Sequence, residues 1–430
     1  MQAIPSDPAA RSSPAAVPRR VNPLALIFTT VVVDLIGFGV VLPVLPLYSE
    51  RFGATPFQIG ALTATMSVAM LIATPLLGKL SDRVGRRPVL AVSVLGTAVS
   101  FVMMGTAQSL TMLFVARALD GFTAGNITTA QAYIADVTPK ARRTKGIGLI
   151  SAGFAIGLVV GPMLGALAAR FGPSVPFFCA AALAAMNGVA ILLFLPESLP
   201  AITGVTPEEP TGDCPPEVAA AGAGADAPLG EMLRERGLRG PIALYATAVF
   251  SMTMVYTTIA LFVSKRYGLA EGGAGAMYVC MGLAAAGTQF IALDWLTARF
   301  RETTLARGGL LASAVFMAAF AASPSPVWFA LAITAFGASN SVNNTLLLSL
   351  VSQRAPASRQ GQVIGVSQGF AGLSRVLAPL AGGWLLGRLG PAAPMLAAAG
   401  VSLVAGLATF PALAEPVAPE AAADPVSVQS

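Results

Sequence analysis

The sequence predicts an all-α membrane protein in which twelve transmembrane helices form two six-helix, pseudo-symmetric halves. Three observations predict this fold class. Of the 430 residues, 55% are hydrophobic and only 11% are charged, whereas a soluble domain carries about 25% charged residues. Apolar runs of about 20 residues recur along the chain, each long enough to cross the hydrocarbon core as a helix. The two halves of the chain also share a repeated sequence pattern.

The apolar runs are expected to be helices, because the strands of a membrane barrel are shorter and alternate between apolar and polar residues. The first six spans form an N-terminal half, residues 23–195, and the last six form a C-terminal half, residues 241–413. Residues 196–240 are rich in Pro, Gly and acidic side chains, which is typical of a linker. Residues 1–22 and 414–430 have the composition of disordered tails. The predicted spans are 23–48, 57–78, 88–107, 111–137, 146–169, 174–195, 241–264, 272–293, 308–322, 327–352, 361–387 and 391–413.

The distribution of basic residues predicts the orientation. Most of the 26 Lys and Arg residues fall on one side of the membrane if both termini are cytoplasmic. The positive-inside rule therefore predicts an even number of spans with both ends in the cytoplasm. We expect a multi-pass, monomeric protein of the inner cell membrane. The net charge of +6 arises from these loops and does not indicate binding to nucleic acid.

An internal repeat relates the two halves. The segment Ala141–Phe154 resembles Ala357–Phe370, and FGPSVPFF, which starts at Phe171, resembles LGPAAPML, which starts at Leu389. The separation between equivalent residues is almost constant, which indicates a duplication. Parallel repeats with a binding site between them, near the bilayer midplane, are the architecture of alternating-access transporters.

A charged segment, GKLSDRVGRRP (Gly78–Pro88), separates the second and third spans. Gly78 and Gly85 would allow a tight turn between helices. One interpretation is a basic loop that only orients the protein. That interpretation does not require Asp82 among the cations, so we expect Asp82 to act as a conformational latch against nearby cations or helix N-termini. The basic residues of the segment are Lys79, Arg83, Arg86 and Arg87.

Asp34 lies within the first span, roughly 16 Å from its start at about 1.5 Å per residue. A carboxylate at this depth costs about 2.5–3.5 kcal/mol, and such a residue usually faces a cavity or a partner. It is either part of a structural ion pair or a protonatable coupling group. Gly37, Gly39, Pro43 and Pro46 follow it and would kink and thin the helix beside a cavity.

The fourth span carries Arg117 and Asp120, which can pair on one helix face. A buried arginine needs a carboxylate, and both Asp120 and Asp34 are candidates. Two interpretations remain: a static Arg117–Asp120 pair, or an arginine that moves to Asp34 when one carboxylate takes a proton. Asp34, Arg117 and Asp120 are therefore the predicted proton-coupling residues.

The fifth span carries glycines at a spacing of four residues, followed by Pro162, which we call the glycine stripe: Gly153, Gly157, Gly161 and Gly165. Small residues at this spacing allow another helix to approach closely. We expect the stripe to pack against the eighth span, where Gly282, Ala284, Ala285, Ala286 and Gly287 are also small.

Polar residues in other spans are candidates for substrate binding. They are equally consistent with hydrogen bonds between helices, because unpaired amides are costly in a membrane. Phe290 and Trp384 are weaker aromatic candidates. The predicted substrate-binding residues are Asn126, Gln131, Tyr256, Gln289, Asn340, Asn343, Asn344 and Arg375.

The composition also argues against other chemistry. The chain has no histidine, the commonest metal ligand, so proton transfer would have to use carboxylates. It lacks the G-x-x-x-x-G-K-[ST] loop of an ATP site. We therefore expect no enzyme activity, no metal and no cofactor, and an ion gradient as the energy source.

The segment Gly78–Pro88 resembles the loop signature of the major facilitator superfamily, G-x-L-[SA]-D-R-x-G-R-R. The string G-x-x-x-G-x-x-x-G-P-x-x-G at Gly153–Gly165 is similar to a motif of its proton antiporters, which symporters usually lack. Residues 32–198 resemble the tetracycline/proton antiporters, and spans 327–352 and 361–387 are similar to the wider 12-helix drug/proton antiporter family. The resemblance implies a major facilitator fold.

The same resemblance implies roles for three residues. Asp34 would be the acid near the substrate, Arg117 the arginine linked to proton coupling, and Asp82 the gating-loop acid that helps to hold the outward-open state. The sequence departs from the family in two ways: it has no histidine for a histidine relay, and Asp120 stands where relatives often have glutamine or a small residue. It therefore does not identify tetracycline as the substrate.

The expected function is a proton-coupled antiporter that exports small amphipathic compounds or drugs by alternating access, with antibiotic resistance as a consequence. Its partners would be the small-molecule substrate, protons and the lipid bilayer. The alternative is an uptake symporter or uniporter for a small metabolite, against which the glycine stripe argues. A receptor that does not transport is disfavoured by the intramembrane charges of Asp34, Arg117 and Asp120.

Overall fold

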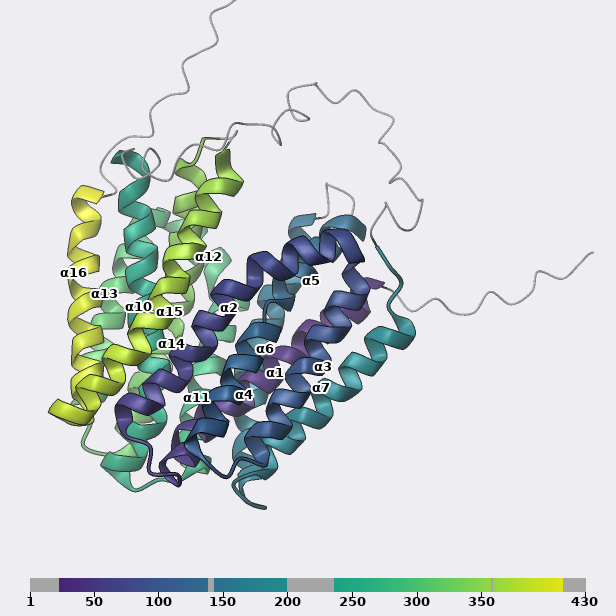
Figure 1. The fold of residues 1–430 in the computed structure, drawn as a ribbon. Helices are drawn as coiled ribbons and strands as arrows, with labels where there is room; N and C mark the ends of the chain where they lie inside the picture. Colours follow the sequence, from purple (N-terminus) through teal and green to yellow (C-terminus); the bar gives the residue numbers. More distant parts are fainter. Residues whose placement is uncertain (1–22, 138–142, 199–235, 357–358, 413–430) are drawn as a thin grey trace, which may run out of the picture.

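The computed structural model describes residues 23–137, 143–198, 236–356 and 359–412, and the regular structure of these residues is helical (Figure 1). The predicted tails and most of the predicted linker lie outside the described residues. The first half contains α1 (Pro23–Glu50), α2 (Pro56–Val84), α3 (Arg86–Gly105), α4 (Leu110–Thr123), α5 (Asn126–Val137), α6 (Arg143–Ala169) and α7 (Val175–Phe194). The second half contains α10 (Arg236–Tyr267), α11 (Glu271–Gly287), η4 (Thr288–Ala292), α12 (Leu293–Arg299), α13 (Glu302–Ala321), α14 (Pro326–Arg354), α15 (Gln360–Leu389) and α16 (Ala393–Ala412).

These helices form the twelve predicted spans when α4 is counted with α5, and α11 with η4 and α12. Within the described residues, eight helical stretches are long and apolar enough to cross a membrane on length and composition alone. Local chemistry sets the starts of several helices. Thr55 and Gln58 form a capping box at α2, and Ser109 and Ser325 cap α4 and α14 by accepting backbone N–H bonds.

Two spans are interrupted, which the sequence analysis did not predict. The helix expected over 111–137 is broken between Thr123 and Asn126. At the break, Gly125 lies so close to α2 that a Cβ on it would come within 2.8 Å of Leu77, and this close approach favours glycine. The span expected over 272–293 contains the π-helical turn η4, and such turns are frequent at functional sites.

The second helix is longer than predicted. α2 continues to Val84, and Gly78 lies inside it, with no atom within 4 Å of the position of a Cβ. The turn is made by Gly85 alone, whose φ of 111° favours glycine. The prediction that Gly78 helps to form the turn is therefore wrong. The polar sequence that follows Gly78 marks the end of the apolar run but not of the helix, because charged residues are good helix formers in water.

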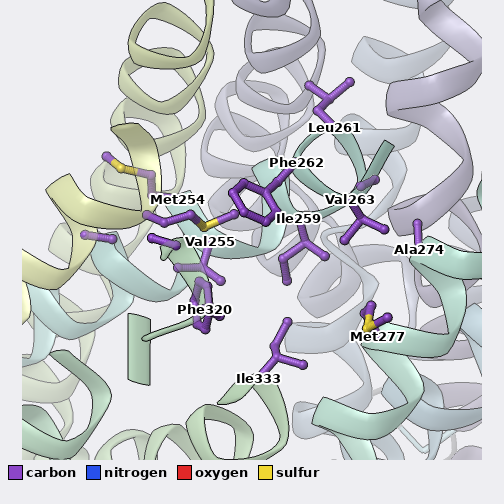
Figure 2. Packing of buried hydrophobic residues seen from close by; sticks show 14 of the residues in the cluster. Met254, Val255, Ile259, Leu261, Phe262, Val263, Ala274, Met277, Phe320 and Ile333 are labelled. Atoms are coloured by element: carbon purple, nitrogen blue, oxygen red, sulfur yellow. The ribbon is translucent and has the colours of Figure 1, made fainter. Parts of the chain in front are cut away.

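Each half packs as a bundle. In the first half α1 packs on α6, α3 on α7 and α2 on α4, and in the second half α10 packs on α15 and α13 on α14 and α16. The two halves meet mainly where α2 contacts α15 and α6 contacts α11 (Figure 1). The largest hydrophobic cluster lies mostly in the second half, reaches Leu47 and Ile59 of the first half, and includes the stacked rings of Phe262 and Phe329, with ring centroids 5.2 Å apart. Figure 2 shows part of it, including Phe320 and Ile333.

The glycine stripe faces α1, in its own half. A Cβ on Gly161 would come within 2.6 Å of Gly39 Cα, and a Cβ on Gly157 would meet Leu35 at a similar distance. The prediction that these glycines pack against the eighth span is therefore wrong. The two spans do contact one another, but through another face of α6, where Gly275 of α11 lies against Ala166. Helix α6 thus has a small-residue face toward α1 and a second contact face toward α11.

Candidate functional site

The two halves are closed against each other at one end of the bundle, which we call the closed end. Here Arg51 Nη2 lies 3.4 Å from Glu271 Oε1, and Lys265 Nζ lies 3.8 Å from Glu50 Oε1. Backbone contact is also close, since a Cβ on Gly60 would come within 2.1 Å of the Pro379 carbonyl oxygen. Ion pairs and small residues therefore seal this end of the interface between the halves.

At the opposite end, which carries the Gly78–Pro88 segment, the halves diverge (Figure 1); we call this the open end. The side chains of Leu76 and Leu80 on α2 are exposed here. On the facing helix α15, a Cβ on Gly361, Gly365 or Gly369 would meet no atom of another described segment within 4 Å. The α2–α15 contact is thus tight near residues 60 and 379, and these three glycines toward the open end make no such close approach to described residues.

Asp34 lies in the middle of α1, is partly buried, and faces helix α5. Its carboxyl group lies beside the side chain of Asn126 and within electrostatic range of Asp120. Among the described residues, no Lys or Arg nitrogen lies within 4 Å of it. Asn126 is buried at the start of α5, and its Oδ1 finds no hydrogen-bond partner within the described part of the chain. The break between α4 and α5 therefore places an amide against this acid.

Arg117 and Asp120 form a buried ion pair on α4. Their side chains are 4% and 5% exposed, and Arg117 Nη1 lies 2.6 Å from Asp120 Oδ2. The Ser100 hydroxyl of α3 adds a contact to Asp120. Two carboxylates were predicted as partners of Arg117, and in this conformation Arg117 forms its ion pair with Asp120 and not with Asp34. Among the described residues, the Nε atom of Arg117 has no hydrogen-bond partner, so the N–H donor at this atom is unused.

The second half presents neutral polar groups from three helices. Tyr256 on α10 contacts Asn340 on α14, and the Tyr278 hydroxyl of α11 donates to the Tyr256 carbonyl oxygen. Within η4, Gln289 Oε1 accepts hydrogen bonds from Ser341 at 3.1 Å and Thr345 at 3.0 Å. The π-helical turn is therefore tied to α14 at the depth where Asn340 lies, while Phe290 beside it is exposed.

The remaining substrate-binding candidates lie in different surroundings. Asn344 and Asn340 line a narrow crevice with Tyr245, and Tyr245 contacts Arg375. Asn343 instead faces α13, where its Nδ2 donates to Ser313 at 3.1 Å and its side chain packs on Gly309. Gln131 is exposed on α5, and Trp384 is exposed near the closed end. For Asn343, the structural interpretation fits this geometry.

The charged segment at the open end forms a cluster within the first half. Arg86 lies 2.5 Å from Asp82, 3.2 Å from Asp136 on α5, and donates to Ser81 Oγ at 2.7 Å. Glu197, after α7, accepts the backbone N–H groups of Arg86 and Arg87 at 2.9 and 3.2 Å, so it caps α3. Arg83 is exposed, and Arg87 donates to the Leu192 carbonyl oxygen.

Sequence reasoning missed Asp136 and Glu197. Each is a carboxylate at the end of an apolar run, at the same end of the bundle as the basic segment Gly78–Pro88. That position could have indicated that they lie near its cations, but the pairing itself depends on how α5 and α7 fold against α3.

A family model, "Major Facilitator Superfamily", matches residues 27–366 and 242–428. The chain belongs to the Major Facilitator Superfamily. Its twelve helices in two halves are the fold of that superfamily, and it is an integral, multi-pass membrane transporter.

Similar proteins within the superfamily carry names that refer to drug resistance. The chain is 30% identical over 373 residues to the tetracycline resistance protein, class C, of Escherichia coli, covering 84% of this chain and 88% of that protein. It is 26% identical over 370 residues to multidrug resistance protein 1 of Bacillus subtilis (strain 168), covering 84% and 89%. The class B tetracycline resistance protein of Escherichia coli is 35% identical over 178 residues, covering 41% and 44%.

Solved structures of the superfamily share the fold at lower identity. A bacterial homologue of the human lysosomal transporter Spinster, in an inward-facing and unoccupied conformation, superimposes with a TM-score of 0.74 at 16% identity, covering 93% of this chain and 98% of that one. The human organic anion transporter MFSD10 has a TM-score of 0.65 at 24% identity, covering 90% and 98%. These similarities concern the fold alone.

Proposed function

We propose that this superfamily member is a proton-coupled antiporter that exports small amphipathic compounds, including drugs, by alternating access. The names of the tetracycline and multidrug resistance relatives support drug efflux. The open end is the cytoplasmic end in this proposal, since it carries the basic segment Gly78–Pro88. Both termini are then cytoplasmic, the protein is a monomer in the inner cell membrane, and the proton gradient supplies the energy.

The observation that carries the proposal is the position of Asp34. It is an intramembrane carboxyl group beside a neutral amide, with no cation within 4 Å among the described residues. Such a group can take up a proton from one side and release it to the other as its access to water changes. Arg117, the nearest candidate counter-ion on the fourth span, is already paired with Asp120.

Coupling follows if two forms of the carrier can change conformation: the form with Asp34 protonated and the form with substrate bound. The empty, deprotonated form would hold an unpaired charge between closed halves, which is unfavourable in a membrane. A proton that enters from outside would then allow the empty carrier to return to the conformation that is open to the cytoplasm. Substrate bound from the cytoplasm would leave by the reverse change of conformation. Tyr256, Gln289 and Asn340 supply polar contacts on the opposite wall, and Asn126 and Gln131 extend the polar path of the first half.

The proposal is tested by transport in proteoliposomes with an imposed pH gradient, using tetracycline and the dye rhodamine 123 as probes. We expect uphill movement of at least one probe against the direction of proton flow, abolished by a protonophore. Accumulation in the same direction as protons would instead indicate the symporter alternative. Equilibration without response to the gradient would indicate a uniporter. Protein-free vesicles are the control.

A further inference from the structure

Arg375 is an arginine in the middle of α15 that lacks an acidic partner. Its side chain is partly buried, about halfway along a helix of 30 residues. Among the described residues, no Asp or Glu oxygen lies within 4 Å of it. The other intramembrane arginine, Arg117, has Asp120 at 2.6 Å. Charged side chains within membranes pair with a partner or face a cavity that a ligand enters, so Arg375 needs a further explanation.

The surroundings of Arg375 hold it in place without neutralising it. The buried phenol of Tyr245 on α10 contacts both Arg375 and Gln368. The neighbouring Ser374 donates to the Ala246 carbonyl oxygen at 2.9 Å, which fixes α15 against α10 at this level. The guanidinium therefore contacts an uncharged phenol, which in turn contacts the amide of Gln368.

A narrow crevice lies next to this cluster. In this conformation it is too narrow to hold a water molecule, and it is lined by Tyr245, Asn340 and Asn344 together with the apolar side chains of Ala248, Val249 and Met252. The crevice thus combines a phenol, two amides and an apolar wall, and its phenol is the group that contacts the guanidinium. Guanidinium offers five N–H donors in a planar fork that fits a carboxylate.

We propose that Arg375, positioned by Tyr245, binds an acidic group of the transported compound, so that the substrates are amphipathic organic acids or zwitterions carrying a carboxylate. This inference rests on the proposed function, since it names the substrate class of the same site. The charges of the two halves are then complementary to a zwitterion. Asp34 of the first half faces its basic or proton-donating part, and Arg375 of the second half faces its acid.

The test compares two dyes that differ only in the acid: rhodamine 110, which has a free carboxylate, and rhodamine 123, its methyl ester. Binding to the purified protein in nanodiscs is measured by fluorescence anisotropy. We expect wild type to prefer the acid, and Arg375→Gln to weaken binding of the acid by at least about tenfold, the loss of one charge-assisted hydrogen bond. Binding of the ester should change less than about twofold, which is the scatter of surface substitutions. Tyr245→Phe should weaken binding of the acid alone, and Arg388→Gln, an exposed arginine of the same helix, is the matched control.

Two results would overturn the inference. The first is a wild type that does not prefer the acid over the ester. The second is an equal loss of both dyes in Arg375→Gln that Asp34→Asn restores, because Arg375 would then be a counter-ion for Asp34 in the closing interface. The same experiments distinguish this inference from the proposed function. If the protein prefers the acid but shows no gradient-driven transport, the proposed function is wrong and the Arg375 site is supported. If the protein transports only the ester in response to the gradient, the proposed function is supported and the Arg375 site is wrong.

Discussion

At the scale of single residues, the two carboxylates of the first half differ in their surroundings. Asp120 is buried against Arg117, at 2.6 Å, and is part of an ion pair. Asp34 is partly buried beside Asn126 and has no cation nearby among the described residues. Removing one partner of a buried pair leaves an uncompensated charge, whereas removing an isolated carboxyl group leaves none. The same chemical change should therefore lower stability at Asp120 but not at Asp34.

We predict that Asp120→Asn lowers the free energy of unfolding by about 3–5 kcal/mol, because Arg117 loses its partner. Asp34→Asn should leave stability unchanged or raise it, because it removes a charge that costs about 2.5–3.5 kcal/mol within the membrane. Thermal unfolding of the purified variants in one detergent measures both. Equal losses in the two variants would show that Asp34 is also held by a structural ion pair.

The sequence predicted some of these contacts and not others, for a physical reason. Arg117 and Asp120 are three residues apart on one helix, so their pairing follows from helix geometry. Which face of α14 each asparagine occupies depends on the packing of α13, so the sequence alone did not separate Asn343, bonded to Ser313, from Asn344, which lines a narrow crevice. The positions of Glu197 and Asp136 beside Arg86 likewise depend on contacts between distant segments.

At the scale of helices, the motif on α6 was recognised correctly but its partner helix was predicted wrongly. The spacing of Gly153, Gly157, Gly161 and Gly165 predicts a close helix contact but does not identify the helix that makes it. In the structure that helix is α1, which carries its own Gly39 at the contact. Helices α6 and α11 do touch, but nearer the closed end, through Gly275 and Gly282. Helix number and approximate bounds followed from hydropathy, whereas faces and breaks depended on tertiary contacts.

We predict that Gly161→Ala destabilises the first half, because the added Cβ would lie 2.6 Å from Gly39 Cα and α1 would have to move. Overpacking of this kind costs about 1–3 kcal/mol. Gly308→Ala, in α13, is the matched control: no atom lies within 4 Å of its Cβ position, so it should be neutral or stabilising by up to about 1 kcal/mol. Unfolding in sodium dodecyl sulfate compares the two. Similar behaviour of the two variants would mean that the α1–α6 contact is looser than described.

The α2–α3 junction gives a prediction about turnover rather than stability. Asp82 is largely exposed, and Arg86 keeps Asp136 and Ser81 as partners without it. Asp82→Asn should therefore change stability by less than about 1 kcal/mol. If Asp82 stabilises the opposite conformation as a latch, the variant would lose about 1 kcal/mol of stabilisation in that conformation. Its population, and with it the transport rate, would then fall by about fivefold.

Initial transport rates at equal amounts of reconstituted protein check this prediction. Lys79→Gln, which removes a neighbouring exposed charge, should retain the wild-type rate. A wild-type rate in Asp82→Asn as well would show that the segment serves only to orient the protein in the membrane.

At the scale of the whole molecule, the closed and open ends describe one state of a carrier that must also adopt the opposite one. Ion pairs from Glu50 and Arg51 to the second half seal one end. At the other end, a Cβ on any α15 glycine from Gly361 to Gly369 would meet no other described segment within 4 Å. Those glycines offer a surface on which α2 can close without steric clash. The fold therefore allows the two halves to rock relative to one another.

We predict that two distances change in opposite directions when the carrier turns over. Spin labels on Leu80→Cys and Gly365→Cys span the open end, and labels on Phe171→Cys and Leu389→Cys span the closed end; Cys179, Cys214 and Cys280 are first replaced by serine. Lowering the pH or adding a transported dye should shorten one distance distribution and lengthen the other, as pulsed electron resonance can measure. Distances that move together, or only at one end, would contradict rigid rocking.

The central claim is that a proton on Asp34 couples the gradient to export, and the most direct test is transport by Asp34→Asn in proteoliposomes. A neutral amide cannot exchange a proton, so this variant should lose uphill, gradient-driven transport of a dye that wild type concentrates. It should still exchange labelled for unlabelled dye at equal concentrations, because binding and the rocking of the halves remain. Undiminished uphill transport by Asp34→Asn would contradict the account.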